Sequence, residues 1–207
     1  MTTPANPFDT RAKTWDDDPA KLARAQAVAD AMRQDLSLAP TLRALEYGCG
    51  TGLLSFALAD ALGHITLADS SAGMLAALAD KLAAQPMPHM QPLKLDLATD
   101  PPPSERYDLI YSLMTFHHIA DTDKVLADLF ALLEPEGHLC IADLDAEDGS
   151  FHGPGFDGHK GFDRSDLGNR AERAGFRSID FRTVFNITKS ESQGQKEFPV
   201  FLMVARK

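Results

Sequence analysis

Three closely spaced glycines, Gly48, Gly50 and Gly52, give the first sign of a ligand site. They follow an apolar run at residues 42–46 and precede leucines at helical spacing. Glycine has no β-carbon and adopts positive φ at low cost, so such a turn lets backbone N–H groups approach a ligand. The helix that follows directs the positive end of its dipole to the same place. The pattern predicts a strand, a glycine turn and a helix that together bind a carboxylate or phosphate group.

An acidic residue narrows the class of ligand. Asp69 lies 69 − 48 = 21 residues after the first glycine, at the end of the next predicted strand, where a carboxylate can accept hydrogen bonds from both hydroxyls of a ribose. Dinucleotide-binding folds carry G-x-G-x-x-G, but this chain has Leu53 at the third glycine position. The spacing therefore favours a ribose-bearing ligand and disfavours a pyrophosphate.

Two adjacent histidines, His117 and His118, follow the fourth predicted strand. An imidazole titrates near neutral pH and can accept a proton from a hydroxyl or ammonium group. Neighbouring side chains in regular structure do not both point inward, so we expect one of the two to deprotonate or position an acceptor. His152 and His159 lie seven residues apart in a glycine-rich loop, which matches no strong zinc pattern. The sequence therefore predicts no metal.

Composition limits the possible partners. The chain has 207 residues, of which 44% are hydrophobic and 24% charged, as in ordinary globular domains. Its net charge of −10 works against binding to nucleic acid or to an anionic membrane. Two cysteines offer no disulfide framework, and no apolar run is long enough to cross a bilayer. We expect a cytoplasmic protein that acts on a small molecule, and the sequence leaves its oligomeric state open.

Short apolar segments alternate with helical patterns along the first two thirds of the chain. This alternation predicts a mainly parallel sheet with helices on both faces. A helix is predicted at residues 18–37, and later helices are expected to begin near residues 54, 71 and 121. The predicted strands are residues 42–46, 64–68, 93–97, 107–111 and 138–143.

The last third of the chain has a different character. A glycine-rich loop at residues 149–161 precedes a capped helix at 163–174. Two β-rich runs, 178–188 and 198–205, are joined by a polar loop at 189–197 and are expected to close a sheet edge as antiparallel strands. We expect one compact domain in which residues 1–40 form an N-terminal cover and helix, and residues 41–207 form the cofactor-binding domain.

The segment Glu46-Tyr47-Gly48-Cys49-Gly50-Thr51-Gly52, followed by Asp69 and by Asp96-Leu97, resembles the class I S-adenosylmethionine-dependent methyltransferases. The resemblance extends from about residue 42 to the C-terminus, and residues 107–119 are similar to the small-molecule branch of the family. It implies an α/β fold with a doubly wound, seven-stranded, mainly parallel sheet and an antiparallel last strand. It also implies methyl transfer from S-adenosylmethionine to an O, N or C nucleophile of a small intracellular molecule.

The resemblance assigns roles to individual residues. Glu46 would orient the glycine loop and the methionine end of the cofactor, and Asp69 would hold the ribose. Asp96, with the backbone of the next residue, would read the adenine edge. The complete cofactor set that it implies is Glu46, Gly48, Cys49, Gly50, Asp69, Ser70, Met74, Asp96, Leu97 and Ser112. Some of these residues have a structural alternative: the glycines can form a plain tight turn, Asp96 can cap a strand end, and Met74 can belong to the core.

A second group of residues is expected on the acceptor side. The loop after the fifth strand gathers four carboxylates, including Asp145, which either attract a cationic acceptor or are simply solvated. Phe151 and His152 begin an aromatic and glycine-rich stretch typical of a mobile lid. Trp15 either covers the cofactor crevice or anchors the first helix to the sheet.

Two other functions remain open on the sequence alone. A nicotinamide-dependent oxidoreductase uses a similar glycine turn, although Leu53 counts against it. A cofactor-binding subunit without catalytic activity would keep the glycine turn and Asp69 but transfer no methyl group.

Overall fold

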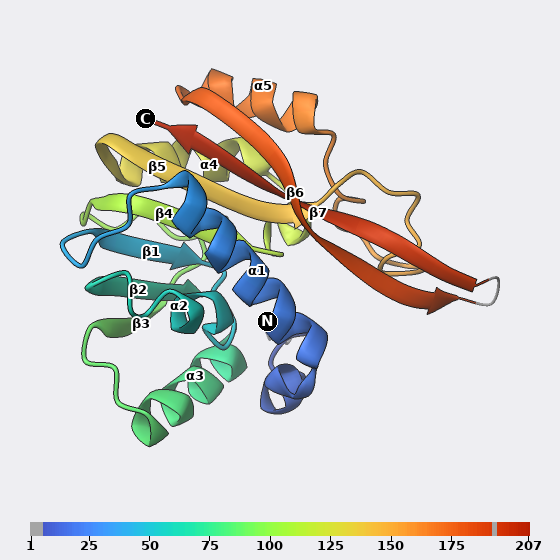
Figure 1. Ribbon diagram of the computed structural model, residues 1–207, viewed down its shortest axis with the longest axis horizontal. Coiled ribbons are helices and arrows are strands. Elements are labelled where there is room, and N and C mark those ends of the chain that lie inside the picture. Colours follow the sequence, from blue (N-terminus) through green and yellow to red (C-terminus); the bar gives the residue numbers. More distant parts are fainter. Residues whose placement is uncertain (1–5, 192–193) are drawn as a thin grey trace.

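The computed structural model describes residues 6–191 and 194–207 and shows a twisted seven-stranded sheet between two layers of helices (Figure 1). The strands lie in the order β3-β2-β1-β4-β5-β7-β6. Their bounds are β1 Arg43–Tyr47, β2 His64–Asp69, β3 Met90–Lys94, β4 Tyr107–Leu113, β5 Leu133–Leu144, β6 Arg177–Glu191 and β7 Gly194–Arg206.

The direction of the strands confirms the predicted fold class. The pairs β1–β2, β1–β4, β2–β3 and β4–β5 are parallel. Strand β7 is antiparallel to both of its neighbours, β5 and β6. The chain runs outward from β1 to β3 and then crosses to β4, so the order of the strands reverses between β1 and β4. Ligands bind at the carboxyl ends of the strands beside such a reversal.

Four of the described α-helices begin at residues whose side chains cap them. Asp18, Ser71, Asp121 and Asp163 each accept a hydrogen bond from a backbone N–H in the first turn of α1, α3, α4 and α5. Pro19 occupies the first position of α1, where the backbone N–H needs no partner within the helix. The helices are α1 Pro19–Asp35, α2 Leu53–Ala57, α3 Ala72–Ala84, α4 Thr122–Leu132 and α5 Arg164–Ala174, with 3-10 turns η1 Ala12–Asp17 and η2 Phe116–His118.

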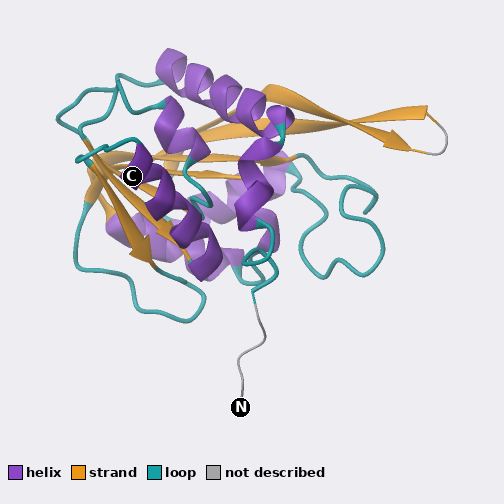
Figure 2. Cartoon of the chain, turned by 90° about the horizontal axis from the view of Figure 1, so that it is seen from below, coloured by secondary structure: helices purple, strands orange, loops and turns teal. Residues whose placement is uncertain are grey.

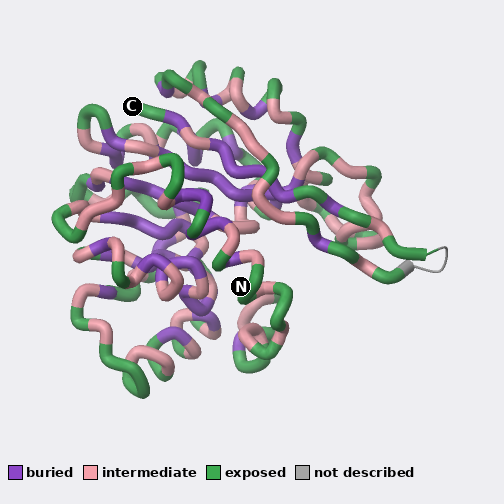
Figure 3. Tube along the Cα trace, in the orientation of Figure 1, coloured by how far each residue is buried: buried purple, intermediate pink, exposed green. Residues whose placement is uncertain are grey.

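Two hydrophobic clusters lie on the two faces of the sheet. One contains apolar residues of α1, α2 and α3, and the other contains those of α4 and α5. Neighbouring residues of β1 alternate between them, with Ala44 in the first and Leu45 in the second. Figure 3 shows the central strands buried along most of their length. None of the helices among the described residues is long and apolar enough to cross a membrane.

Three predicted elements have different bounds in the structure. The third strand is Met90–Lys94, not 93–97, because it is an edge strand in which Pro92 is tolerated without an N–H. The α-helix after the glycines is short, ending at Ala57. Strand β5 begins at Leu133, well before residue 138, so Pro135 and Gly137 lie within it and its pairing with β4 is irregular there.

The predicted polar loop at 189–197 is wrong over most of its length. Strands β6 and β7 continue as a hairpin in which Lys189 pairs with Lys196 and Glu191 with Gly194, while residues 192–193 lie outside the described part of the chain. Figures 1 and 2 show this hairpin projecting beyond the helices. Its far end has no core to cover, so its sequence carries no alternating apolar residues that would mark it as β-structure.

Candidate active site

The carboxyl ends of β1, β2, β4 and β5 bring together the residues expected to do chemistry. The glycine turn follows β1, and Asp69 ends β2. The turn η2, with both histidines, follows β4, and the loop after β5 carries Phe151 and His152. Segments far apart in the sequence therefore share one edge of the sheet, as the alternating pattern predicts.

The glycine turn is held against β2 by its own backbone. Gly48 N and Cys49 N both donate to Ala68 O, at 2.8 and 2.9 Å. Gly48 and Gly50 have φ angles of 71° and 55°, which side chains rarely adopt. A β-carbon at Gly48 would also lie 2.2 Å from Cγ2 of Thr115. The residue at position 48 therefore has to be glycine for two independent reasons.

Asp69 is fixed above this turn by backbone donors. Its Oδ2 accepts from Gly50 N at 2.7 Å, and its Oδ1 accepts from Ser71 N at 2.7 Å. Burial raises the pKa of Asp69, although these hydrogen bonds oppose the increase. Each carboxylate oxygen has a second lone pair, so the group can still accept from both hydroxyls of a ribose. The half-buried Asp69 and the glycine cradle thus fit the nucleoside that the sequence resemblance implies.

Glu46 is buried below the turn. Its Oε2 accepts from Ser55 Oγ at 2.5 Å and from Ser55 N at 3.2 Å, and the same hydroxyl lies 2.7 Å from the Tyr111 hydroxyl. Burial raises the pKa of Glu46 to about 8, because it disfavours the charged form more than the two hydrogen bonds favour it. The Glu46 carboxyl therefore connects the end of β1 to the first turn of α2.

The raised pKa of Glu46 predicts a pH-dependent stability. The folded state keeps the proton up to about pH 8, whereas the unfolded state loses it near 4.5, so the stabilisation is complete below 4.5 and is lost as the pH rises towards 8. Over that window the unfolding free energy should fall by up to about 1.4 kcal/mol per pH unit. Glu46→Gln should remove this part of the decline. Urea unfolding at pH 5 and pH 8, with the exposed Glu172→Gln as control, tests it. Parallel pH profiles for wild type and Glu46→Gln would contradict the assignment.

Several residues of the predicted cofactor set already have partners within the protein. Asp96 Oδ1 accepts a hydrogen bond from Ala98 N at 3.0 Å. This is the capping role expected from the sequence as the alternative to adenine recognition. Leu97 N donates to the Tyr47 hydroxyl at 3.2 Å, and the buried Ser112 donates through Oγ to Tyr47 O at 2.7 Å. These three positions brace the neighbouring strand ends, and their contact with a cofactor stays a prediction.

The remaining members of that set lie close to the turn. Met74 is buried, and its sulfur lies 3.9 Å from where a β-carbon of Gly50 would be. Ser70 is exposed at the start of the loop before α3, where its Oγ accepts from Asn6 Nδ2 at 3.4 Å. Cys49 is buried within the turn, and burial raises the pKa of its thiol well above the ordinary value. Burial therefore favours the neutral form of this thiol.

The N-terminal segment packs over the glycine turn. Nε1 of Trp15 lies 3.9 Å from the position of a Gly50 β-carbon. Asp16 accepts from Thr51 Oγ1 at 2.5 Å, and Asp9 accepts from Ser71 Oγ at 2.6 Å and from Gly73 N at 2.9 Å. Hydrogen bonds to Ser71 and Gly73 lower the pKa of Asp9. Residues of η1 and the segment before it therefore contact both the glycine turn and the start of α3, which together form the expected nucleoside site.

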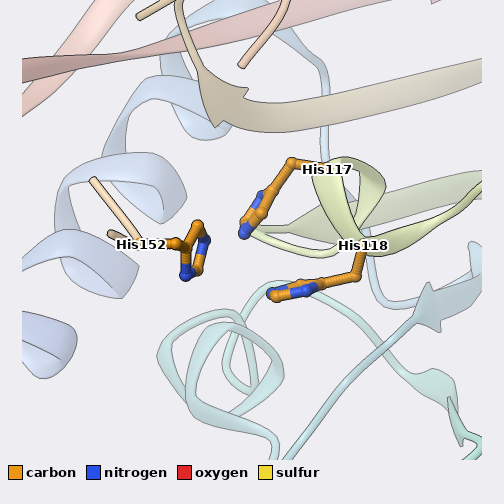
Figure 4. Close-up of side chains that lie close together, drawn as sticks. All are labelled: His117, His118 and His152. Carbon is orange, nitrogen blue, oxygen red and sulfur yellow. The ribbon is translucent and has the colours of Figure 1, made fainter. Parts of the chain in front are cut away.

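Three histidines converge beside this segment (Figure 4). The ligand nitrogens of His117, His118 and His152 all lie within 4.8 Å of one another. The expectation that only one of the two adjacent histidines points inward is wrong, because both lie on the 3-10 turn η2, where successive side chains do not alternate in direction. His159 is elsewhere, with Nε2 2.9 Å from Ile119 O.

His117 is anchored by a buried carboxylate. Its Nδ1–H donates to Asp143 Oδ1 at 2.6 Å, and both side chains are buried. Asp143 Oδ2 accepts from His117 N at 3.2 Å, and Oδ1 also accepts from Leu144 N at 2.7 Å. Burial alone would raise the pKa of Asp143, but the charge and hydrogen bond of His117 and the backbone donors lower it. The pair fixes one tautomer of His117 and leaves Nε2 facing the other two rings.

The other two histidines are neutral. Burial, followed by the neighbouring His117, lowers the pKa of His118 to about 3. The same two causes lower the pKa of His152 to about 4. The His152 ring also stacks on Phe156, with ring centroids 3.9 Å apart.

The acids of the loop after β5 are engaged within the protein. Asp145 accepts from Arg164 Nε and Nη2 at 2.6 Å each, and Glu147 accepts from Gly149 N at 2.7 Å. Asp145 and Glu147 are thus bonded within the protein, and contact of the loop acids with a cationic acceptor stays a prediction. Phe151, which precedes His152, packs its ring 5.2 Å from that of Phe198. Asp145 and Phe151 thus hold the loop to the hairpin and α5.

A separate groove of about 570 Å³ lies between α1 and α2. It is lined by residues including Leu22, Phe56 and Lys81, and its lining contains neither the three glycines nor Asp69 nor a histidine. We place the candidate site at the edge of the sheet where these residues meet, because the groove offers few groups that could react or bind a ribose.

Sequence reasoning missed two features of the site. It did not pair Asp143 with His117, and it did not join His152 to the two adjacent histidines. A signal for both was present, because β4 and β5 are consecutive parallel strands whose carboxyl ends must be neighbours. Side chains that follow the two strands are therefore expected to meet.

Comparison with known proteins agrees with this geometry. A family described as a methyltransferase domain matches residues 45–139, from within β1 to the middle of β5. An uncharacterised methyltransferase of Schizosaccharomyces pombe is 33% identical over 116 residues, 53% of this chain and 41% of its own length. The ubiquinone biosynthesis O-methyltransferase of Marinobacter nauticus is 31% identical over 111 residues, 53% of this chain and 47% of its own length. The chain thus spans about half the length of these relatives or less.

Solved structures share the fold over nearly the whole chain. A crystal structure of an S-adenosylmethionine-dependent methyltransferase from Aquifex aeolicus matches with a TM-score of 0.69. It is 21% identical and covers 94% of this chain and 97% of its own. The fold, the domain match and the relatives agree in the family that this chain resembles, the S-adenosylmethionine-dependent methyltransferases, and they support S-adenosylmethionine as its cofactor.

Proposed function

We propose that this chain transfers the methyl group of S-adenosylmethionine to a nucleophilic atom of a small molecule. The observation that carries the proposal is the position of Asp69 beside the glycine turn. Its two carboxylate oxygens accept hydrogen bonds from Gly50 N and Ser71 N, each at 2.7 Å. A ribose held by this carboxylate lies next to the turn, and the turn faces the histidines through Thr115. Donor and acceptor would therefore meet at the carboxyl ends of β1 and β4.

Methyl transfer from a sulfonium requires little from the protein beyond alignment of the two reactants. When bound, S-adenosylmethionine supplies a methyl group on a sulfonium, from which the sulfur leaves as a neutral thioether. Such an in-line displacement is accelerated by orienting the nucleophile and excluding water. The rings of Phe8, His118 and Phe156 supply an aromatic wall on the acceptor side, with the ring centroid of His118 5.0 and 5.4 Å from those of Phe8 and Phe156.

The net charge of the chain and the loop that bounds the acceptor side support a small acceptor. The net charge of −10 opposes association with nucleic acid phosphates. The acceptor side is bounded by the loop after β5, which is tied down by the bidentate Asp145–Arg164 pair. One relative is named an O-methyltransferase of ubiquinone biosynthesis. These points favour an O, N or C nucleophile on a metabolite-sized molecule rather than a macromolecule.

The N-terminal segment completes this proposal as a cover. Trp15 and Asp16 lie on the glycine turn, and Asp9 bonds to Ser71 at the start of α3. We propose that residues 1–40, of which residues 1–5 lie outside the described part of the chain, act as a cover and helix on a cofactor-binding domain of residues 41–207.

Calorimetric titration separates the candidate functions. We expect S-adenosylmethionine to bind with a stoichiometry of one per chain, and the nicotinamide dinucleotides to give no heat of binding. Incubation with cofactor labelled on the methyl group and with a cell metabolite extract should then move the label into small molecules. Binding without any transfer would support the non-catalytic subunit, and binding of a nicotinamide cofactor instead would overturn the proposal.

A further inference from the structure

We propose that His117, His118 and His152 form a binding site for one divalent transition metal ion of the zinc type, with a coordination position open towards the acceptor. The part of this inference that concerns metal binding stands on the three side chains alone. The part that concerns the acceptor rests on the proposed methyl transfer.

The geometry of the three imidazoles is close to that of a bound metal. Their ligand nitrogens lie within 4.8 Å of one another, and the rings converge in Figure 4. Zinc binds histidine nitrogens at about 2.0–2.1 Å in a tetrahedron, which corresponds to nitrogens about 3.3 Å apart. His152 can make this small approach, because Gly153 and Gly155 follow it and a β-carbon at either would meet no atom within 4 Å. Closure thus requires side-chain rotation and a small shift of one loop.

The second support comes from the group behind His117. Metal-bound histidines usually donate their other ring N–H to a carboxylate, which fixes the tautomer and makes the ligating nitrogen more basic. Here Nδ1 of His117 donates to the buried Asp143 at 2.6 Å, which leaves Nε2 as the ring nitrogen that can bind a metal. The Asp143 carboxylate is itself held by Leu144 N at 2.7 Å. This arrangement has the form of an outer shell around a metal ligand.

Aromatic packing explains only part of the cluster. The His152 ring stacks on Phe156 with an interplanar angle of 20°, and Phe8 meets His118 edge to face. Phenyl rings would satisfy these contacts equally well. They would leave Asp143 without the imidazole that it binds, and they would bring no nitrogens together. Three imidazoles, one of them oriented by a carboxylate, therefore indicate a site where nitrogen atoms bind a metal ion.

The donor set selects the class of metal. Imidazole suits zinc, copper, iron and nickel, whereas magnesium and calcium prefer oxygen ligands. Three histidines with an open fourth position are the arrangement of catalytic rather than structural zinc sites. The carboxylate of Asp143 compensates part of the positive charge of the ion through His117.

The open position gives the metal a role in the proposed reaction. A hydroxyl or thiol of the acceptor would bind there and release its proton to solvent, because a metal ion lowers the pKa of a bound O–H or S–H group. The bound oxygen or sulfur would form the new bond to the methyl carbon with its lone pair. The bond between that carbon and the sulfonium breaks, and its electron pair stays on the departing neutral thioether.

Metal binding can be measured without any turnover. The full-length protein is stripped with a chelator, dialysed and titrated with Co²⁺ and Zn²⁺, while the visible absorption of tetrahedral Co²⁺ and the bound metal per chain are recorded. We expect one ion per chain. His118→Ala and His152→Ala should each weaken binding by at least about 100-fold, since loss of an outer-shell partner alone costs 10–100-fold. The matched control is His64→Ala, an exposed histidine at the amino end of β2, which should bind like the wild type.

Calorimetry with S-adenosylmethionine on the same samples separates this inference from the proposed function. Cofactor binding that persists in the stripped protein and in His152→Ala, together with lost Co²⁺ absorption in the variant, supports the site. A wild type that binds Co²⁺ no more tightly than His152→Ala overturns it, whatever the cofactor titration gives. Methyl transfer that survives complete chelation would overturn the role in activating the acceptor and favour a histidine base instead.

Discussion

Replacing Asp143 with alanine is expected to lower the free energy of unfolding by about 3–5 kcal/mol, because each buried donor left without an acceptor costs about 1–3 kcal/mol. The substitution leaves His117 Nδ1, His117 N and Leu144 N without their acceptor in a site that water does not reach. It also removes a negative charge that acts on Arg24, whose buried Nε has no hydrogen-bond partner among the described residues. Urea unfolding monitored by circular dichroism gives the difference.

Two variants make this result specific. Asp145→Ala breaks the neighbouring bidentate pair with Arg164, where both side chains are partly exposed, and should cost at most about 1 kcal/mol. Asp143→Asn keeps the shape and one acceptor oxygen, so its loss should fall between the two alanine variants. If Asp143→Ala is no more destabilising than Asp145→Ala, the buried pair does not hold η2 to β5.

The glycine turn and Asp69 could be predicted because their signals are local. A turn that needs positive φ at Gly48 and Gly50 is visible as glycine in the sequence, and the end of a strand places the next acid at a known edge. The helix starts were predictable for the same reason, since Asp18 and Ser71 cap the helices that directly follow them.

The histidine cluster could not be obtained from such local signals. His118 and His152 are separated by a helix, a strand and part of a loop, and their meeting depends on how the loop after β5 returns over β4. The spacing of His152 and His159 was informative only about local metal motifs. That restriction led to the expectation of no metal, whereas the fold pairs His152 with residues of another loop.

The C-terminal hairpin shows a different limit. Its core-facing half is apolar and is predicted as strand, but its far half pairs polar residues such as Lys189 and Lys196, whose side chains contact the loop after β5. Backbone pairing leaves no mark in the sequence when neither face is buried. The edge strand β3 was misplaced for a related reason, because its inner residues are flanked by polar ones and by Pro92.

Asp69→Ala should weaken the binding of S-adenosylmethionine by about 100-fold or more. A ribose diol bound to a carboxylate makes two charge-assisted hydrogen bonds, each worth about 1.5–3 kcal/mol. The substitution also removes the acceptor that holds Gly50 N, so the turn loses the bond that fixes it above β2. Calorimetric titration with the cofactor measures the change, and a thermal melt of each variant shows whether the fold is retained.

The matched control for Asp69 is Asp80→Ala, which removes an acid of the same charge from an exposed position of α3. It should bind the cofactor like the wild type, which excludes a general effect of net charge. Asp69→Asn tests the geometry, because an amide offers one acceptor oxygen where the carboxylate offers two. We expect an affinity between those of wild type and Asp69→Ala. Equal affinity in wild type and Asp69→Ala would place the ribose away from β2, and the site built on the glycine turn would then be wrong.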